Sequence, residues 1–317
     1  MDLQQRARII IETNLALQPG ETLLVVTDDP TREVGELFYE AARAMDHRAL
    51  IMQMPEGSAA GEEPPAPVAA AMKAADVALC PTAKSITHTN ARIKAAAAGT
   101  RVVTMPGITM DMLRDGAACA DYDQVERRTR QLTERLTHAK HARIEKDGHV
   151  LELALTGRDG VASPGVYREP GASGNFPSGE AYIAPLEDGA NGTVVIDGSM
   201  VGIGTLTEPM TVTIENGRLT RIEGADAQGP YAERLGILFD QPENGTIAEL
   251  GIGTNEAAKL CGIILEDEKL YGTVHIAFGT NTSFGGITKA DCHLDGIILN
   301  PTLYLDDECI IRKGEFL

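Results

Sequence analysis

The sequence predicts an α/β N-terminal domain with a parallel, Rossmann-like sheet, followed by a β-rich α+β domain. Two observations lead to this fold class. Over the first 145 residues or so, short apolar runs alternate with helical patterns, which is typical of parallel α/β sheets. Beyond them, short strand-like runs and many glycines replace the alternation. We therefore expect one domain over residues 1–145 and another over residues 146–317.

The first domain is expected to join its strands through helices. Runs rich in Val, Leu and Ile predict strands at residues 22–28, 48–54, 76–82 and 101–107. Helical patterns lie at residues 31–45, 67–75 and 90–99, after an opening helix. Strands separated in this way pair in parallel through right-handed crossovers. No GxGxxG motif follows the first strand, so a nucleotide cofactor is not indicated.

The sequence pattern of the second domain differs from that of the first. A long polar helix is expected over residues 121–142 and leads into it. Short strands follow, and the Asn-Gly pair within residues 210–224 predicts a β-hairpin. Helical segments are expected near residues 229–240 and 254–269.

Charge and composition limit the partners. The 317 residues include 46 acidic and 28 basic side chains, for a formal net charge of −18. Such a surface repels phosphate backbones and anionic lipids, so neither nucleic acid nor membrane partners are expected. The N-terminal residues resemble neither a signal peptide nor a membrane span, and the five cysteines include no CxxC motif. Both observations favour a cytoplasmic protein.

Two short apolar runs each carry a histidine. They are TVHIAFG at residues 273–279 and HLDGIIL at residues 293–299, and both predict strands. Because side chains alternate between the faces of a strand, His293 and Asp295 point the same way. If the two runs are neighbours, His275 joins them, and two imidazoles and a carboxylate converge as in a metal site. For a single histidine, the alternative is a core residue with a backbone partner.

Two glutamates lie in apolar settings. Glu180 follows Pro177 and Gly179 at the start of a predicted strand, and Glu249 interrupts the short strand TIAELGIG. A buried carboxylate is costly unless a cation, a hydrogen-bond donor or water accompanies it. A bound metal ion would meet that need.

Four stretches, PSGEAYIAP, AELGIGTN, GTVHIAFG and HLDGIIL, follow one another in the second half of the chain. In this order they resemble the aminopeptidase T family of metallopeptidases, and the resemblance extends into the first half through residues 81–109. It implies a metal-dependent aminopeptidase, a hydrolase in which divalent ions activate the attacking water. It also implies one or two ions of zinc, cobalt or manganese, a short peptide or other small molecule as substrate, and a homodimer.

The resemblance also implies site residues. The family's metal ligands fall on five residues that match in type: Glu180, Glu249, His275, His293 and Asp295. It implies that Glu249 or Asp295 bridges the ions. We assign the catalytic role to Glu180 and Glu249.

The chain departs from the longer peptidases at two positions. Leu270 stands where the resemblance implies a further liganding glutamate, and Thr282 stands where it implies a tyrosine. Glu266 and Glu268 lie near the first of these positions, but the pattern LEDEKLYG places them on a solvated helix end.

The iron-dependent 2,5-dihydroxypyridine dioxygenases resemble the same family and provide a second hypothesis. Their two histidines and aspartate fall on His275, His293 and Asp295, a ligand set that suits Fe(II). Glu180 would then transfer a proton instead of binding metal. A non-catalytic relative that binds metal or ligand is a third hypothesis.

Substrate contacts are expected in the first domain. The stretch CPTAKSITHTNARIKAA begins at the carboxyl end of a predicted strand, where open α/β sheets bind ligands. Thr82 and Ser85 offer hydroxyls, and His88 and Arg92 are spaced to share a helical face. Arg92 has the donors to hold a carboxylate. The alternative is structural, with Thr89 as a helix N-cap and Arg92 as a bridge between domains.

Overall fold

The computed structural model describes residues 1–224, 229 and 231–317. Its contacts divide the chain into two compact units. The first consists of Met1–Glu126 and Gly165–Ser178, and the second of Arg127–Pro164 and Gly179–Leu317. The chain passes from one unit into the other within helix α6, Tyr122–His138. The domain boundary between residues 145 and 146 remains a prediction.

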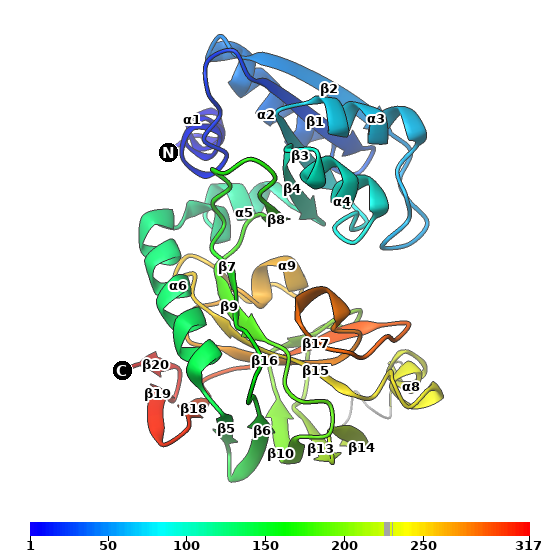
Figure 1. The fold of residues 1–317 in the computed structure, drawn as a ribbon, viewed down its shortest axis with the longest axis vertical. Coiled ribbons are helices and arrows are strands. Elements are labelled where there is room, and N and C mark those ends of the chain that lie inside the picture. The colour runs from blue at the N-terminus through cyan, green and yellow to red at the C-terminus, as the bar shows by residue number, and fades with distance from the viewer. Residues whose placement is uncertain (225–228, 230) are drawn as a thin grey trace. The chain divides into compact units, whose positions relative to one another are not determined.

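A parallel sheet forms the centre of the first unit, as the sequence predicts (Figure 1). The strand order is β2-β1-β3-β4-β8, and each neighbouring pair is parallel. The strands are β1 Thr22–Asp28, β2 Arg48–Met54, β3 Val77–Thr82, β4 Arg101–Pro106 and β8 Ser173–Asn175. The helices are α1 Leu3–Ile9, α2 Arg32–Ala44, α3 Ala66–Ala74, α4 Asn90–Ala97 and α5 Met110–Arg114, with a π-helical turn at Ile10–Asn14 and a 3₁₀ turn at Ala117–Cys119.

Helices cover both faces of this sheet. Helices α3 and α4 share a hydrophobic cluster with Leu24 and Val26 of β1. Helix α2 lies against the other face of β1, where Gly35 approaches the side chain of Thr27. Because both faces are buried at the centre of the sheet, strands β1, β3 and β4 are continuous apolar runs instead of alternating ones.

The second unit contains two antiparallel sheets. One has the order β14-β13-β10-β6-β5-β18-β19-β20, and the other β12-β11-β17-β16-β15-β9-β7. The strands of the first sheet are β5 His141–Lys146, β6 His149–Ala154, β10 Ala190–Ile196, β13 Met210–Glu215, β14 Arg218–Glu223, β18 Thr302–Leu305, β19 Glu308–Arg312 and β20 Glu315–Phe316. Those of the second are β7 Val161–Ser163, β9 Glu180–Ile183, β11 Ser199–Met200, β12 Gly204–Thr205, β15 Ile247–Gly253, β16 Val274–Gly279 and β17 His293–Ile298.

One hydrophobic core joins the two sheets of the second unit. It contains Ile144 and Leu151 from the eight-stranded sheet and Leu250, Ile276 and Ile298 from the seven-stranded sheet. Residues that alternate with these along β15, β16 and β17 therefore face away from the core. The fold class of an α/β domain followed by a β-rich α+β domain is confirmed, and the predicted hairpin forms as β13 and β14.

Helices are shorter in the second unit than the sequence suggests. Only Ile264–Asp267 of the segment 254–269 is helical, as α9, because the Asp267 carboxylate accepts hydrogen bonds from the backbone N–H groups of Cys261 and Gly262 and fixes a loop there. Among the described residues that follow α6, the other helical segments of this unit are α8 Ala232–Asp240 and a 3₁₀ turn at Thr282–Phe284. Residues 225–228 and 230, which adjoin the expected helix at 229–240, lie outside the described residues.

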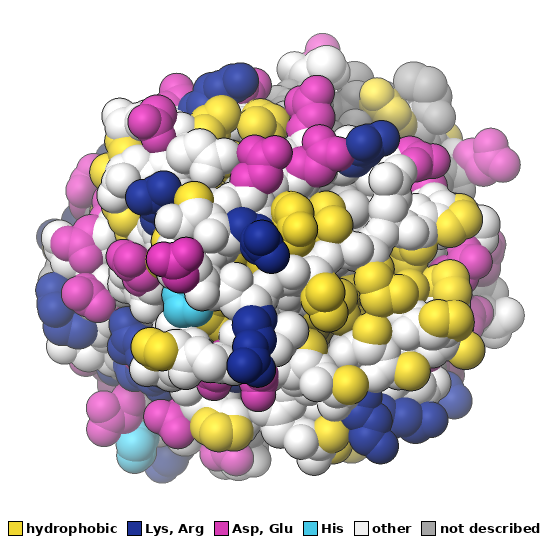
Figure 2. Space-filling view, turned by 90° about the horizontal axis from the view of Figure 1, so that it is seen from above, with side chains coloured by type: hydrophobic (Ala, Val, Ile, Leu, Met, Phe, Trp, Pro, Cys, Tyr) yellow, Lys and Arg dark blue, Asp and Glu magenta, His cyan; other side chains and the backbone are white. Residues whose placement is uncertain are grey.

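The surface carries both signs of charge. On the face that Figure 2 shows, acidic side chains lie among basic ones. Among the described residues, none of the helices is long and apolar enough to cross a bilayer. The expectations about nucleic acid, a homodimer and the cytoplasm remain predictions.

Candidate metal centre

Strands β16 and β17 bring the two histidines and the aspartate to one face, as predicted. The strands are antiparallel neighbours, with Ala277 opposite Asp295 and Gly279 opposite His293. His275 lies two positions before Ala277, so it points to the same face as the other two side chains. The condition on which the sequence argument depended, that the two runs pair as neighbouring strands, is therefore met.

Strands β15 and β9 add the two glutamates to this face. Glu249 is opposite Ala277, and Gly251 is opposite His275. Gly253, on the same face of β15, is opposite Glu180. Small residues thus stand opposite the polar ones, and they leave room for these side chains to converge.

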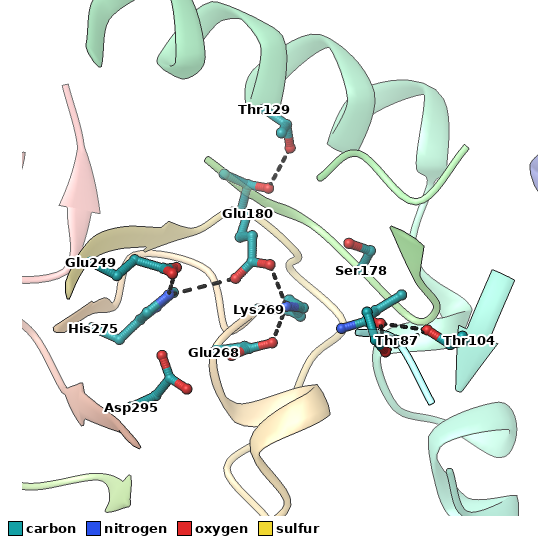
Figure 3. Close-up of polar contacts among 12 residues, drawn as sticks. Thr87, Thr104, Thr129, Ser178, Glu180, Glu249, Glu268, Lys269, His275 and Asp295 are labelled. Carbon is teal, nitrogen blue, oxygen red and sulfur yellow. Dashed lines mark hydrogen bonds and ion pairs between the residues drawn. The ribbon is translucent and has the colours of Figure 1, made fainter. Parts of the chain in front are cut away.

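The side chains meet in a compact cluster, of which Figure 3 labels Glu180, Glu249, His275 and Asp295. The Nε2 atom of His275 lies 3.3 Å from Oε1 of Glu249 and 3.6 Å from Oε2 of Glu180. The Nε2 atom of His293 lies 3.4 Å from both Oε2 of Glu249 and Oδ1 of Asp295. Glu249 therefore lies between the two imidazoles, with one oxygen toward each.

Burial and mutual charge shift the pKa values in this cluster. Burial alone would raise the pKa of Glu249, but hydrogen bonds and charge from the two histidines outweigh it and lower the pKa to about 2. Burial alone would lower the pKa of His275, yet Glu249 and Glu180 raise it to about 9. Asp295 and Glu249 likewise raise the pKa of His293 well above its usual value, against the effect of burial. Without a metal ion, the two imidazoles therefore tend to be protonated and positively charged.

The nitrogen positions suit metal binding. The Nδ1 atom of His293 lies 2.8 Å from the carbonyl oxygen of Thr280. A ring nitrogen that donates to a carbonyl carries the hydrogen, which leaves the Nε2 lone pair for a metal. The Nε2 atom of His275 also faces the carboxylates, while its Nδ1 is buried and has no hydrogen-bond partner among the described residues.

The structure adds Glu268 and Lys269, which sequence reasoning missed. Glu266 and Glu268 were expected on a solvated helix end, but Glu266 is buried. The side chain of Glu268 is only 13% exposed and forms an ion pair with Lys269. The fully buried ammonium of Lys269 also lies 2.6 Å from Oε1 of Glu180. Burial, and then the charges of Glu180 and Asp295, raise the pKa of Glu268 to about 8 despite the opposing charge of Lys269. The signal in the sequence is weak, because a charged segment such as EDEK is usually exposed.

Two groups of side chains have the spacing of metal ligands. One consists of Glu180, Glu268 and His275, and the other of Glu249, His293 and Asp295. In each group, the candidate ligand atoms lie within 4.8 Å of one another. Imidazole nitrogens and carboxylate oxygens are suitable donors for divalent transition metals, and the Oε2 atom of Glu180 is buried without a hydrogen-bond partner among the described residues. This part of the second unit therefore fits a divalent ion.

The residues expected to contact substrate lie in the first unit. Thr82 Oγ1 donates to the carbonyl of Lys84, and Arg92 Nε donates to the carbonyl of Thr87. His88 lies in the exposed turn before α4, so it does not share a helical face with Arg92, because the helix begins at Asn90.

Two further contacts complete this region. Ser85 Oγ donates to Thr87 Oγ1 at 3.0 Å. Thr89 caps α4, since its hydroxyl oxygen accepts a hydrogen bond from the backbone N–H of Arg92. A role of Thr82, Ser85, His88 and Arg92 in substrate binding remains a prediction.

A protein family and a curated protein match this chain in sequence. Residues 12–317 match the NicX family, 2,5-dihydroxypyridine 5,6-dioxygenase. A 2,5-dihydroxypyridine 5,6-dioxygenase of Pseudomonas putida KT2440 is 31% identical over 167 residues, which are 49% of this chain and 47% of that protein. The sequence match thus spans about half the length of this curated relative.

Two solved structures share the fold. The structure of the 2,5-dihydroxypyridine dioxygenase from Pseudomonas putida KT2440 has a TM-score of 0.83 at 22% identity and covers 99% of this chain and 96% of its own. The structure of AmpT from Thermus thermophilus has a TM-score of 0.72 at 16% identity and covers 99% of this chain and 98% of its own. At these identities, the likeness concerns the fold alone.

The expected aminopeptidase activity is wrong. The family match and the curated relative point to a dioxygenase, an oxidoreductase, and not to a hydrolase or metalloprotease. The five matching residues did not separate the two activities, because two histidines and an aspartate serve either kind of metal chemistry. The expectation of a divalent metal is supported by the family and by the two ligand groups. The chain belongs to the NicX family of 2,5-dihydroxypyridine 5,6-dioxygenases.

Proposed function

We propose that this protein is a ring-cleaving dioxygenase that uses Fe(II) and dioxygen to open 2,5-dihydroxypyridine or a closely related hydroxypyridine. The observation that carries the proposal is the convergence of His275, His293 and Asp295 on one face of the sheet, in a chain that matches the dioxygenase family over residues 12–317. Two imidazoles and one carboxylate on one face leave other positions around Fe(II) free for small ligands.

We propose that His275, His293 and Asp295 hold the iron. A ferrous ion, when bound, supplies the redox chemistry that lets dioxygen react with an aromatic ring. The carbonyl of Thr280 fixes the ring of His293 through Nδ1, so that Nε2 is presented to the ion. Glu249 lies within 3.4 Å of both imidazoles and keeps them turned toward the same point.

Glu180 is the residue that we propose for proton transfer. Its Oε1 is held by the Lys269 ammonium, whereas its Oε2 has no hydrogen-bond partner among the described residues. A carboxylate held in this way has one oxygen oriented by the protein and one that can accept a proton from a substrate hydroxyl.

Oxygen uptake tests the proposal directly. Protein purified without oxygen and loaded with Fe(II) should consume dioxygen when 2,5-dihydroxypyridine is added, and the absorbance of the aromatic ring should disappear at the same rate. His293→Ala and Asp295→Asn should lower the rate by at least about 100-fold, because each removes an iron ligand.

A histidine elsewhere in the unit provides the matched control. His149 on β6 contacts Thr193 and lies outside both ligand groups, so His149→Ala should keep the rate of the unmodified protein. If iron-loaded protein consumes no oxygen with any dihydroxypyridine isomer, the proposed activity is wrong.

A further inference from the structure

The two ligand groups differ in whether a lysine side chain of the protein bonds to their carboxylates. In the group of Glu249, His293 and Asp295, the ion pairs among the described residues link the carboxylates to histidines. In the group of Glu180, Glu268 and His275, a lysine ammonium bonds to both carboxylates. Two of its three members therefore already bond to a cationic side chain of the protein itself.

Lys269 is placed like a bound cation. Its side chain is fully buried, and its Nζ lies between Oε1 of Glu180 and Oε1 of Glu268 (Figure 3). Taking an ammonium out of water is unfavourable unless hydrogen-bonded carboxylates compensate for the lost hydration. Both acidic side chains do so here, and Oε1 of Glu180 lies 2.6 Å from Nζ. Lys269 therefore has the partners that a buried ammonium needs.

The backbone fixes the position of this ammonium. The N–H of Asn255 donates to the carbonyl of Lys269 at 2.9 Å, and the N–H of Lys269 donates to the carbonyl of Glu266 at 3.0 Å. The Asp267 carboxylate holds the preceding loop through its backbone N–H groups. Lys269 is thus a buried residue on a turn whose backbone is fixed by hydrogen bonds, unlike a mobile lysine on the surface.

We propose that Lys269 occupies a second cation position in the cluster and restricts this chain to one divalent ion. A metal ion at Glu180 and Glu268 would have to displace the ammonium or share two carboxylates with it, at close range and with like charge. His275 borders both groups through its contacts with Glu180 and Glu249. With Lys269 in place, the imidazole of His275 binds the ion that His293 and Asp295 hold.

The inference rests on the metal part of the proposed function and not on its substrate, so metal counting tests it separately from turnover. Metal-free protein is equilibrated with Mn(II), passed through a desalting column and analysed for bound metal per chain. The unmodified protein should retain one Mn(II) with the electron paramagnetic resonance spectrum of an isolated ion. Lys269→Met, which keeps the length of the side chain but removes the charge, should retain two ions that are magnetically coupled.

Two variants complete the test. Lys269→Arg keeps the positive charge and should retain one ion. Lys73→Met removes an exposed lysine on α3 and should bind metal like the unmodified protein. Two coupled ions in the unmodified protein, or one ion in a folded Lys269→Met variant, would overturn the proposal. If Lys269→Met does not fold, the metal count and spectrum of the unmodified protein still decide, and loss of oxygen uptake alone has no bearing on the result.

Discussion

Gly251 is the position where the smallest substitution should disturb the metal centre. It lies on β15 directly opposite His275, and the imidazole occupies the space that a side chain would need. A Cβ atom at residue 251 would lie 1.9 Å from Nε2 and 2.2 Å from Cε1 of His275. The backbone of Gly251 is ordinary strand, so the effect of Gly251→Ala comes from this contact alone.

The geometry gives the magnitude. To reach an ordinary contact of about 3.5 Å, the ring must retreat by roughly 1.5 Å. Metal ligands must lie within about 0.2 Å of their proper distance, so His275 is lost as a ligand. We expect the affinity for Fe(II) or Mn(II) to fall by at least about 100-fold, or roughly 2.8 kcal/mol. Overpacking should also lower the free energy of unfolding by about 1–3 kcal/mol.

Competition with a chelator dye measures the affinity, and chemical denaturation measures the stability. Gly236→Ala is the control, because Gly236 lies in α8 and an added Cβ would meet nothing within 4 Å. This helical substitution should raise stability by up to about 1 kcal/mol and leave metal affinity unchanged. If Gly251→Ala binds metal as tightly as the unmodified protein, the inferred role of His275 is wrong.

Three further predictions follow from pKa values and burial. Metal affinity should rise with pH between about pH 6 and pH 8, by up to about tenfold per pH unit for each proton displaced. The reason is that the metal must displace protons from the imidazoles, because the metal-free pKa is about 9 for His275 and is also raised for His293. Equal affinities across a series of metal titrations at different pH would contradict this. Cys261 is an exposed residue, but desolvation of its thiol and the nearby carboxylates of Asp267 and Glu266 raise its pKa to about 12. It should therefore react with iodoacetamide at least about tenfold more slowly than free cysteine at pH 8, which peptide mapping by mass spectrometry will measure. Phe38→Ala should lower the free energy of unfolding by about 3–5 kcal/mol, since Phe38 is fully buried on α2; a loss below about 1 kcal/mol in urea would show that its packing is loose.

Local sequence patterns predicted the strands whose own apolar residues are buried. Strands β1, β3 and β4 are continuous apolar runs between helices, and both faces of their sheet are covered. Strand β8 was not predicted, because Ser173, Gly174 and Asn175 carry no apolar signal and pair only where β4 offers a free edge. The helix expected over 254–269 shortened to α9, since Asp267 binds backbone N–H groups that a helix would have used.

The sequence by itself determined that His293 and Asp295 share a face, because the two-residue period of a strand is a local property. His275 joins that face only through the pairing of β16 with β17. Only the tertiary structure decided that Lys269 and Glu268 enter the same cluster. Their burial depends on a turn anchored by distant residues, and no local pattern distinguishes a buried lysine from an exposed one. The cation content of the site is therefore a property of the folded chain, whereas the shared face of His293 and Asp295 is already present in the order of the residues.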